Sequence, residues 1–186
     1  LTFYESSIFR SLRAVAPRID LLHDLKVTHG HLILESNVLD VATMVHVQSE
    51  ATNIYIEPIQ GGQGIAYTDT PVNWRSVNDI TFNVPLYVRG SETLTLNADS
   101  DEDANGDLVF SVEANIVATE NSVQQFFFTA ADMKMESFVE ALMANVTVQT
   151  SNYTNSVLSI GNNHGGFWLS DAELDRIRTR TTLNIG

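Results

Sequence analysis

One acidic stretch, residues 99–107, holds the side chains that are best spaced for chemistry. Its oxygen-bearing residues stand at alternate positions, and these are Asp101, Asp103, Asn105 and Asp107. A hard cation such as calcium prefers several such oxygens on a sharply turning backbone, and the spacing matches the first half of an EF-hand loop. The second half fails, because Val112 stands where that loop needs glutamate. The alternative to a calcium site is a hairpin turn with positive φ angles at Asn105 and Gly106.

A second candidate is a pair of histidines that precedes a glutamate, namely His29, His31 and Glu35. Residues two apart share one face of a strand, so these side chains could hold a transition metal inside a cupin-like barrel. The glycines expected around a cupin motif are missing. We therefore favour the alternative, in which the histidines lie where a loop meets a strand and the glutamate is on the surface.

Motifs for covalent or nucleotide chemistry are absent from the sequence. There is no G-x-S-x-G, no cysteine nucleophile and no phosphate-binding loop, since residues 61–64 lack the required glycine spacing. We predict that the protein is not an enzyme, and that it has no cofactor unless the acidic stretch binds calcium.

The chain has 186 residues, no cysteine and a formal net charge of −13, from 10 Lys+Arg and 23 Asp+Glu. The lack of cysteine excludes disulfides and thiolate zinc sites. The net charge disfavours binding to nucleic acid. An acidic, lysine-poor composition fits a halophilic source, because concentrated salt screens the repulsion, but it also fits an ordinary acidic protein. No apolar stretch is long enough for a membrane span, and no signal peptide is predicted.

Positive charge is concentrated near the two ends of the chain. The residues concerned are Arg10, Arg13, Arg18, Arg176, Arg178 and Arg180. If the termini meet, as in many single domains, these arginines form a basic pole suited to subunit contacts or to an anionic membrane surface. The alternative is local salt bridging.

Most of the chain alternates apolar and polar residues and is rich in Val, Ile, Thr, Phe and Tyr, which is typical of half-buried β-strands. The expected strands are His31–Val38, Ala42–Ser49, Asn53–Ile59, Asp79–Arg89, Glu92–Ala98, Asp107–Thr119, Ser122–Thr129, Ser156–Ile160 and Thr179–Ile185. Pro85 predicts an edge strand or a bulge. Without βαβ alternation or an internal repeat, we expect an all-β fold, a single eight-stranded antiparallel jelly-roll β-sandwich over 19–186. Residues 1–18 are expected to form an N-terminal arm or a short amphipathic helix.

Two further short helices are expected within the β fold. Apolar residues such as Met135, Phe138 and Val139 recur at helical spacing and predict a helix over 130–144. A capping box at Ser170 predicts another.

Large aromatic residues occur in stretches that look like long loops. Trp74, Phe167 and Trp168 are candidate anchors between subunits, because exposed aromatics are common at interfaces. The alternative is that they pack in the core.

A cysteine-free, lysine-poor, acidic β domain with basic termini resembles the small single jelly-roll major capsid proteins of haloarchaeal icosahedral, membrane-containing viruses, the sphaerolipovirus type. The resemblance implies a structural protein of the virion shell. It further implies partners, namely copies of itself and a larger jelly-roll capsid protein, assembled over the viral membrane surface and without specific nucleic acid.

The alternative function is a secreted, calcium-stabilised β-sandwich that binds carbohydrate. In that case aromatic side chains would stack on sugar rings, and the candidates are Tyr55, Tyr67, Trp74 and Trp168.

Light scattering after size-exclusion chromatography separates these two functions. A capsid protein of this type is expected to form dimers or larger assemblies that depend on molar salt. A carbohydrate-binding module is expected to stay monomeric and to be retained on a polysaccharide column. A monomer at every salt concentration would contradict the capsid hypothesis.

Overall fold

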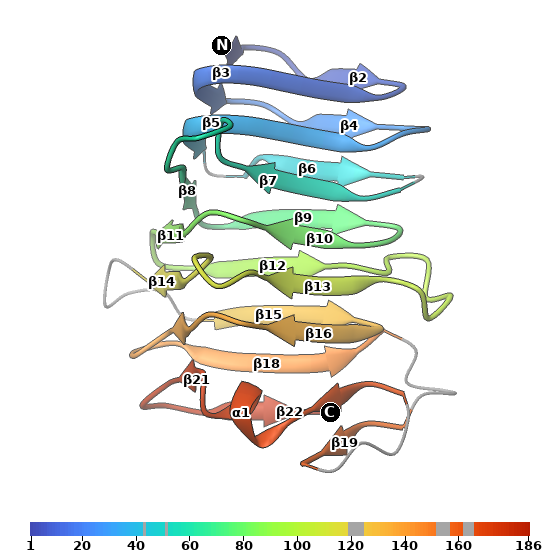
Figure 1. Cartoon of the computed structure of the whole chain (residues 1–186), viewed down its shortest axis with the longest axis vertical. Helices are drawn as coiled ribbons and strands as arrows, with labels where there is room; N and C mark the ends of the chain where they lie inside the picture. Colours follow the sequence, from blue (N-terminus) through green and yellow to red (C-terminus); the bar gives the residue numbers. More distant parts are fainter. Residues whose placement is uncertain (43, 51, 119–124, 152–156, 162–165) are drawn as a thin grey trace.

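The strands of this protein pair in parallel, so the predicted antiparallel jelly roll is wrong. In the computed structural model, every pairing among the described residues is parallel. The structure describes residues 1–186 except 43, 51, 119–124, 152–156 and 162–165. Successive coils stack along one long axis, with the two termini at opposite ends (Figure 1). The fold is therefore a parallel β-solenoid and neither a β-sandwich nor a jelly roll.

Each coil contributes one strand to an eight-stranded sheet, called sheet B here. Its strands, in spatial order, are β2 (Ser7–Phe9), β4 (Leu25–Val27), β6 (His46–Ser49), β9 (Val72–Ser76), β12 (Thr93–Asn97), β15 (Gln125–Ala130), β18 (Asn145–Thr150) and β22 (Leu183–Ile185). These strands lie one above the other in Figure 1. Sheet B therefore forms one side of the solenoid along its whole length.

The rest of each coil belongs to a twelve-stranded sheet, called sheet A. It begins with β1 (Thr2–Phe3), β3 (Leu12–Leu21) and β5 (Leu32–Val41). Beyond β5 it divides into two wings, because the two halves of β5 pair with different strands. Wing 1 contains β7 (Ile54–Glu57), β10 (Ile80–Phe82), β13 (Asp107–Phe110) and β16 (Asp132–Met135). Wing 2 contains β8 (Ile65–Asp69), β11 (Leu86–Arg89), β14 (Ile116–Ala118), β17 (Val139–Glu140) and β21 (Ile177–Arg178).

Inward side chains stack on their register partners from coil to coil and fill the space between the two sheets. One row runs down wing 1 and consists of Leu34, Ile56, Phe82, Phe110 and Met135, all of them buried. The aromatic members extend this row across to sheet B, since Phe110 packs against Phe128 with ring centroids 5.9 Å apart. The alternation seen in the sequence is real, but it directs side chains into the lumen of a solenoid.

A short accessory segment precedes β21 and β22, the last two strands of the solenoid. It contains β19 (Ser159–Ile160), which pairs with β20 (Trp168–Leu169), and the helix α1 (Asp171–Leu174). Ser170 caps α1, and its capping box with Glu173 confirms that prediction. No helix among the described residues is long and apolar enough to cross a membrane.

The helix predicted over 130–144 is wrong. This stretch begins at the last residue of β15 and forms β16, β17 and the corners around them. Two of the residues whose spacing suggested a helix, Met135 and Val139, point inward, but Leu142 and Met143 are exposed at a corner. Because the chain turns a corner every few residues, its apolar positions recur at a spacing close to that of a helix. Residues 1–18, expected as an arm or amphipathic helix, form β1, β2 and the first part of β3.

Two predicted local features are also corrected. The stretch at Asn105–Gly106 is not a hairpin, because it connects β12 of sheet B with β13 of sheet A. The positive φ angles lie instead at Asp99, Glu102 and Ala104. Pro85 lies at the corner between β10 and β11, where its carbonyl accepts a hydrogen bond from the Ala66 amide at 2.8 Å, so it marks neither an edge strand nor a bulge.

Trp74 lies in the core, where it packs against Phe82 with ring centroids 5.6 Å apart. Its indole Nε1 has no hydrogen-bond partner among the described residues. We expect Trp74→Ala to lower the free energy of unfolding by about 4 kcal/mol because it leaves a large cavity. Trp74→Phe should cost about 1–2 kcal/mol, because it keeps most of the packing and removes an unpaired donor.

Urea unfolding followed by circular dichroism measures both changes. Tyr4→Ala is the control, because this side chain is 70% exposed and its loss should leave the midpoint nearly unchanged. Equal midpoints for Trp74→Ala and wild type would contradict the placement of Trp74 in the core.

Candidate functional site

The basic residues of the two chain ends do not come together, because the termini lie at opposite ends of the solenoid (Figure 1). Near the first coil, Arg13 pairs with Glu35 at 2.5 Å, and Arg18 pairs with Asp20 at 2.7 Å. Both pairs follow the local salt bridging that the sequence left as an alternative.

Arginines of the last coils are also held locally. Arg178 lies 3.0 Å from Glu140 and 3.9 Å above the ring of Phe138. Arg176 donates to the backbone carbonyl of Met135 at 2.5 Å. Arg10 and Arg180 are both exposed. The six arginines therefore lie in two separate groups, and the structure does not form one basic pole.

The aromatic candidates have different environments. Trp74 and Phe167 are buried, which is the core packing left as their alternative. Trp168 is half-buried, and its indole Nε1 donates to the Gly161 carbonyl at 2.8 Å. Of these three side chains, only Trp168 is partly exposed and accessible to a partner.

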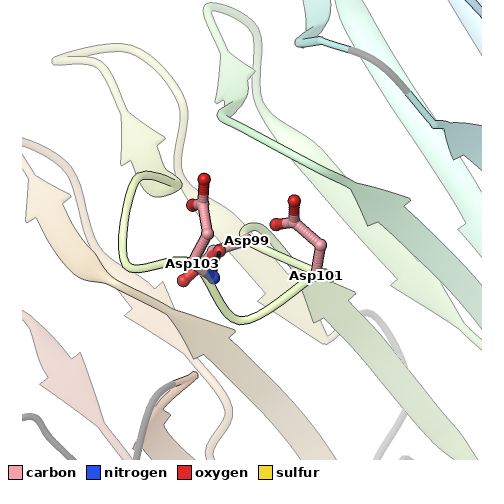
Figure 2. A group of neighbouring side chains, drawn as sticks. All are labelled: Asp99, Asp101 and Asp103. Atoms are coloured by element: carbon pink, nitrogen blue, oxygen red, sulfur yellow. Dashed lines mark hydrogen bonds between the residues drawn. The ribbon is translucent and has the colours of Figure 1, made fainter.

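Three carboxylates meet on the acidic loop between β12 and β13, as Figure 2 shows. One oxygen each from Asp99, Asp101 and Asp103 lies within 4.8 Å of the others. Burial, and then the neighbouring Asp103 charge, raises the pKa of Asp101. Such a cluster has the oxygen chemistry that a calcium ion needs, but exposed acidic groups often gather without an ion.

Only part of the predicted ligand set belongs to this cluster. Asp107 instead forms an ion pair with Lys134 on β16. Asn105 donates to the Asp103 carboxylate at 3.0 Å. Asp99, which the sequence did not single out as a ligand, takes the central place. No pattern in the sequence identifies it, because its inward turn depends on a positive φ angle of 64°.

Asp99 is fully buried and holds the loop closed. Its carboxylate accepts hydrogen bonds from the backbone amides of Asp103 and Ala104, each at 3.0 Å, and from the Ser151 hydroxyl. Gly106 passes so close that a Cβ atom there would lie 2.2 Å from the Asp99 nitrogen. Asp99 is therefore satisfied by the protein itself.

A shallow groove lies on the outer face of sheet A, where β3, β5 and β7 lie side by side. We call it the Tyr55 groove. Five of its lining residues carry polar groups, and they are Arg13, Glu35, Tyr55, Glu57 and Gln60. Its volume is about 410 Å³. Glu35 and Glu57 are register partners on β5 and β7, so the stacking of coils brings their carboxylates to the same level of the groove.

The Tyr55 ring is fixed in place by its neighbours. Asn53 Nδ2 donates to the Tyr55 hydroxyl at 2.6 Å and to Asp79 at 3.0 Å. On the other side, the ring of His31 packs against Tyr55 at a centroid distance of 5.7 Å. A ring held in this way loses little conformational entropy when a ligand packs against it.

The two carboxylates of the groove are also oriented. Arg13 Nε donates to Glu35, which raises the pKa of Arg13. Asn83 Nδ2 donates to Glu57 at 2.8 Å. Each carboxylate keeps further lone pairs that can accept hydrogen bonds from a ligand. The cupin-like metal set of His29, His31 and Glu35 is not assembled, because among the described residues only Asp99, Asp101 and Asp103 bring their ligand atoms together.

The loop after β7 forms one wall of the groove. Pro58 and Gln60 line it, and Gly62 closes a turn onto the Ile59 carbonyl at 2.8 Å. Gly64 packs against the corner between β10 and β11, where a Cβ atom would come within 2.5 Å of Val84. Glycine is therefore required for the loop to return to wing 2 at this point.

A second aromatic group on wing 2 is occupied by its own ion pairs. The rings of Tyr67 and Tyr87 lie 5.6 Å apart, and the Arg89 guanidinium lies 5.1 Å from the Tyr67 ring centre. Arg89 forms ion pairs with both Asp40 and Asp69. These contacts give the group a structural role in holding neighbouring coils together.

The comparisons with known proteins identify no relative, because no family model, curated protein or solved structure matches the chain. Of the groove residues, the sequence singled out Tyr55 as a sugar-stacking candidate, and Arg13 and Glu35 for other roles. It missed Glu57 and Gln60. Glu57 is marked only as an outward residue of a strand, and Gln60 only as a loop residue, and both descriptions fit many surface residues equally.

Substitutions of two acidic residues test the structural role of the 99–107 loop. Asp99→Ala should lower the free energy of unfolding by about 3 kcal/mol, since it leaves two backbone donors and Ser151 unpaired. Asp101→Asn should leave the midpoint unchanged or raise it. The raised pKa of Asp101 means that its ionised form weighs against the folded state at neutral pH.

Thermal melts measure both effects, and melts in EDTA and in millimolar calcium test the loop for cation binding. Calcium binding would raise the melting temperature of wild type more than that of Asp101→Asn. Unchanged melting temperatures in calcium would end the calcium hypothesis. Equal stability of Asp99→Ala and wild type would contradict the role assigned to Asp99.

Proposed function

We propose that this β-solenoid binds a glycan chain in the Tyr55 groove. The observation that carries the proposal is a fixed aromatic ring, Tyr55, beside two carboxylates, Glu35 and Glu57, on adjacent coils. This proposal keeps the carbohydrate-binding function left open by the sequence and places it on a different fold.

The chemistry of the groove suits a sugar. An aromatic ring offers a flat apolar surface to the C–H groups on one face of a sugar ring, and its hydroxyl adds a polar edge. Carboxylates accept hydrogen bonds from sugar hydroxyls, and charged acceptors make the stronger bonds. The side chains of Arg13 and Gln60 supply donors at the exposed rim. A shallow, open site is suited to contact with one face of a long glycan.

Charge favours one class of glycan over another. The groove contains two carboxylates against one guanidinium, within a protein of formal net charge −13. A glycan with uronic acid or sulfate groups would be repelled. We therefore propose a neutral or amino-bearing glycan as the ligand.

The capsid hypothesis loses its main support with the jelly roll. Its implied partners, its virion location and its assembly with a larger jelly-roll protein all followed from the resemblance to that jelly-roll family. They stay untested predictions, and nothing in the groove depends on them.

Tyr55→Ala tests the proposal directly. Affinity electrophoresis in gels that contain neutral or amino-bearing polysaccharides should show retardation of the wild type. The substitution should weaken binding at least about tenfold, because it removes the stacking surface. Glu57→Gln should weaken it less, because the amide keeps one acceptor oxygen.

The matched control is Tyr4→Ala, which removes an exposed tyrosine outside the groove and should bind like wild type. The proposal is contradicted if no such polysaccharide retards the wild type, or if Tyr55→Ala binds equally well. Release of reducing ends during the assay would contradict the prediction that the protein is not an enzyme.

A further inference from the structure

The outward face of sheet B carries no charged side chain over β12, β15, β18 and β22, all of which the structure describes. We call this surface the neutral face. Its central row consists of Thr95, Phe127, Thr147 and Asn184, which are register partners. Amide side chains flank the row, and Gln125 donates to the Thr147 hydroxyl at 3.1 Å.

This lack of charge contrasts with the rest of the surface. The outward side of wing 2 and of β3 carries an ion-pair network that includes Arg18, Asp40 and Arg89, with a further pair at Glu140 and Arg178. The protein as a whole has 23 acidic residues against 10 basic ones. Two copies therefore repel each other over most approaches, and this repulsion is weakest where neutral faces meet.

The chemistry of the neutral face is complementary to itself. An amide both donates and accepts, and so does a hydroxyl, so the same groups can pair across a two-fold axis. Phe127 is half-buried in the central row and offers an apolar anchor. A stacked parallel sheet is also a suitable platform, because sheets pack face to face about 10 Å apart.

We propose that the neutral face binds the neutral face of a second copy, and that the two copies form a two-fold symmetric dimer. The four strands are about 4.8 Å apart and rise about 3.3 Å per residue, and β22 is shorter than the other three, so the footprint is roughly 320 Å². This is smaller than the roughly 800 Å² per partner of a standard interface. The dimer is accordingly of micromolar or weaker affinity.

The proposal is independent of glycan binding. The Tyr55 groove lies on sheet A, so it stays open when sheet B is covered. A dimer would present two grooves that face away from the interface. Loss of one function in a variant need not affect the other.

Analytical ultracentrifugation from micromolar to millimolar concentration tests the dimer, at physiological and at molar salt. The mass should rise from monomer to dimer. Molar salt should not weaken association, because no ion pair crosses the interface and salt screens the remaining repulsion.

Thr95→Lys should weaken the dimer at least about tenfold, because it brings two like charges together at the interface. The matched control is Thr81→Lys on wing 1, where Thr81 is equally half-buried and outward-facing, and it should dimerise like wild type. Asn184→Lys is a second test at an exposed position of the same row, where folding is not at risk.

The proposal is overturned if the wild type is monomeric over the whole range, or if both neutral-face variants dimerise like wild type. It is also overturned if a monomeric wild type binds an insoluble polysaccharide that Thr95→Lys no longer binds and Tyr55→Ala still does. That result would assign the neutral face to a glycan.

Discussion

The stacking of inward side chains on their register partners is the constraint on which the rest of the structure depends. Because side chains alternate along a strand, a shift of one residue in any coil would turn its apolar side chains outward. In sheet B, Val47, Trp74 and Leu96 stand one above another, and all are buried. Each coil therefore fixes the register of the next, and loops of different length between strands leave that register intact.

The same constraint determines the two surfaces to which functions are assigned here. Along each strand, outward residues alternate with buried ones. Glu35 and Glu57 therefore come together on adjacent coils, although they are 22 positions apart in the sequence. On the opposite sheet, the same alternation places Phe127 and its register partners on the neutral face. The solenoid thus separates charged and aromatic groups on sheet A from an uncharged array on sheet B.

Some strands could be predicted from the sequence, such as β5 and β12, but β3, β9 and β16 fall in stretches expected as an arm, a loop and a helix. The direction in which the strands pair could not be predicted. Alternation reports which residues face inward, whether the strands are parallel or antiparallel. A repeat would have revealed the coils, yet the separations along the row Arg13, Ile33, Tyr55, Thr81, Val109 and Lys134 are all different. Likewise, Tyr55 was recognisable as an exposed aromatic candidate. Its neighbour Glu57 was not, because the groove exists only after the coils are stacked.

Cross-linking of register partners tests the parallel solenoid most directly, since the chain has no native cysteine. Thr81 and Val109 are partners on β10 and β13, and adjacent strands bring Cα atoms within the reach of a disulfide. Mild oxidation of the double variant Thr81→Cys/Val109→Cys should give an intramolecular disulfide, detected by mass spectrometry. Thr81→Cys/Thr95→Cys, on opposite outer faces, should give none. Free thiols in the first variant, or equal disulfide yields in both, would contradict the account.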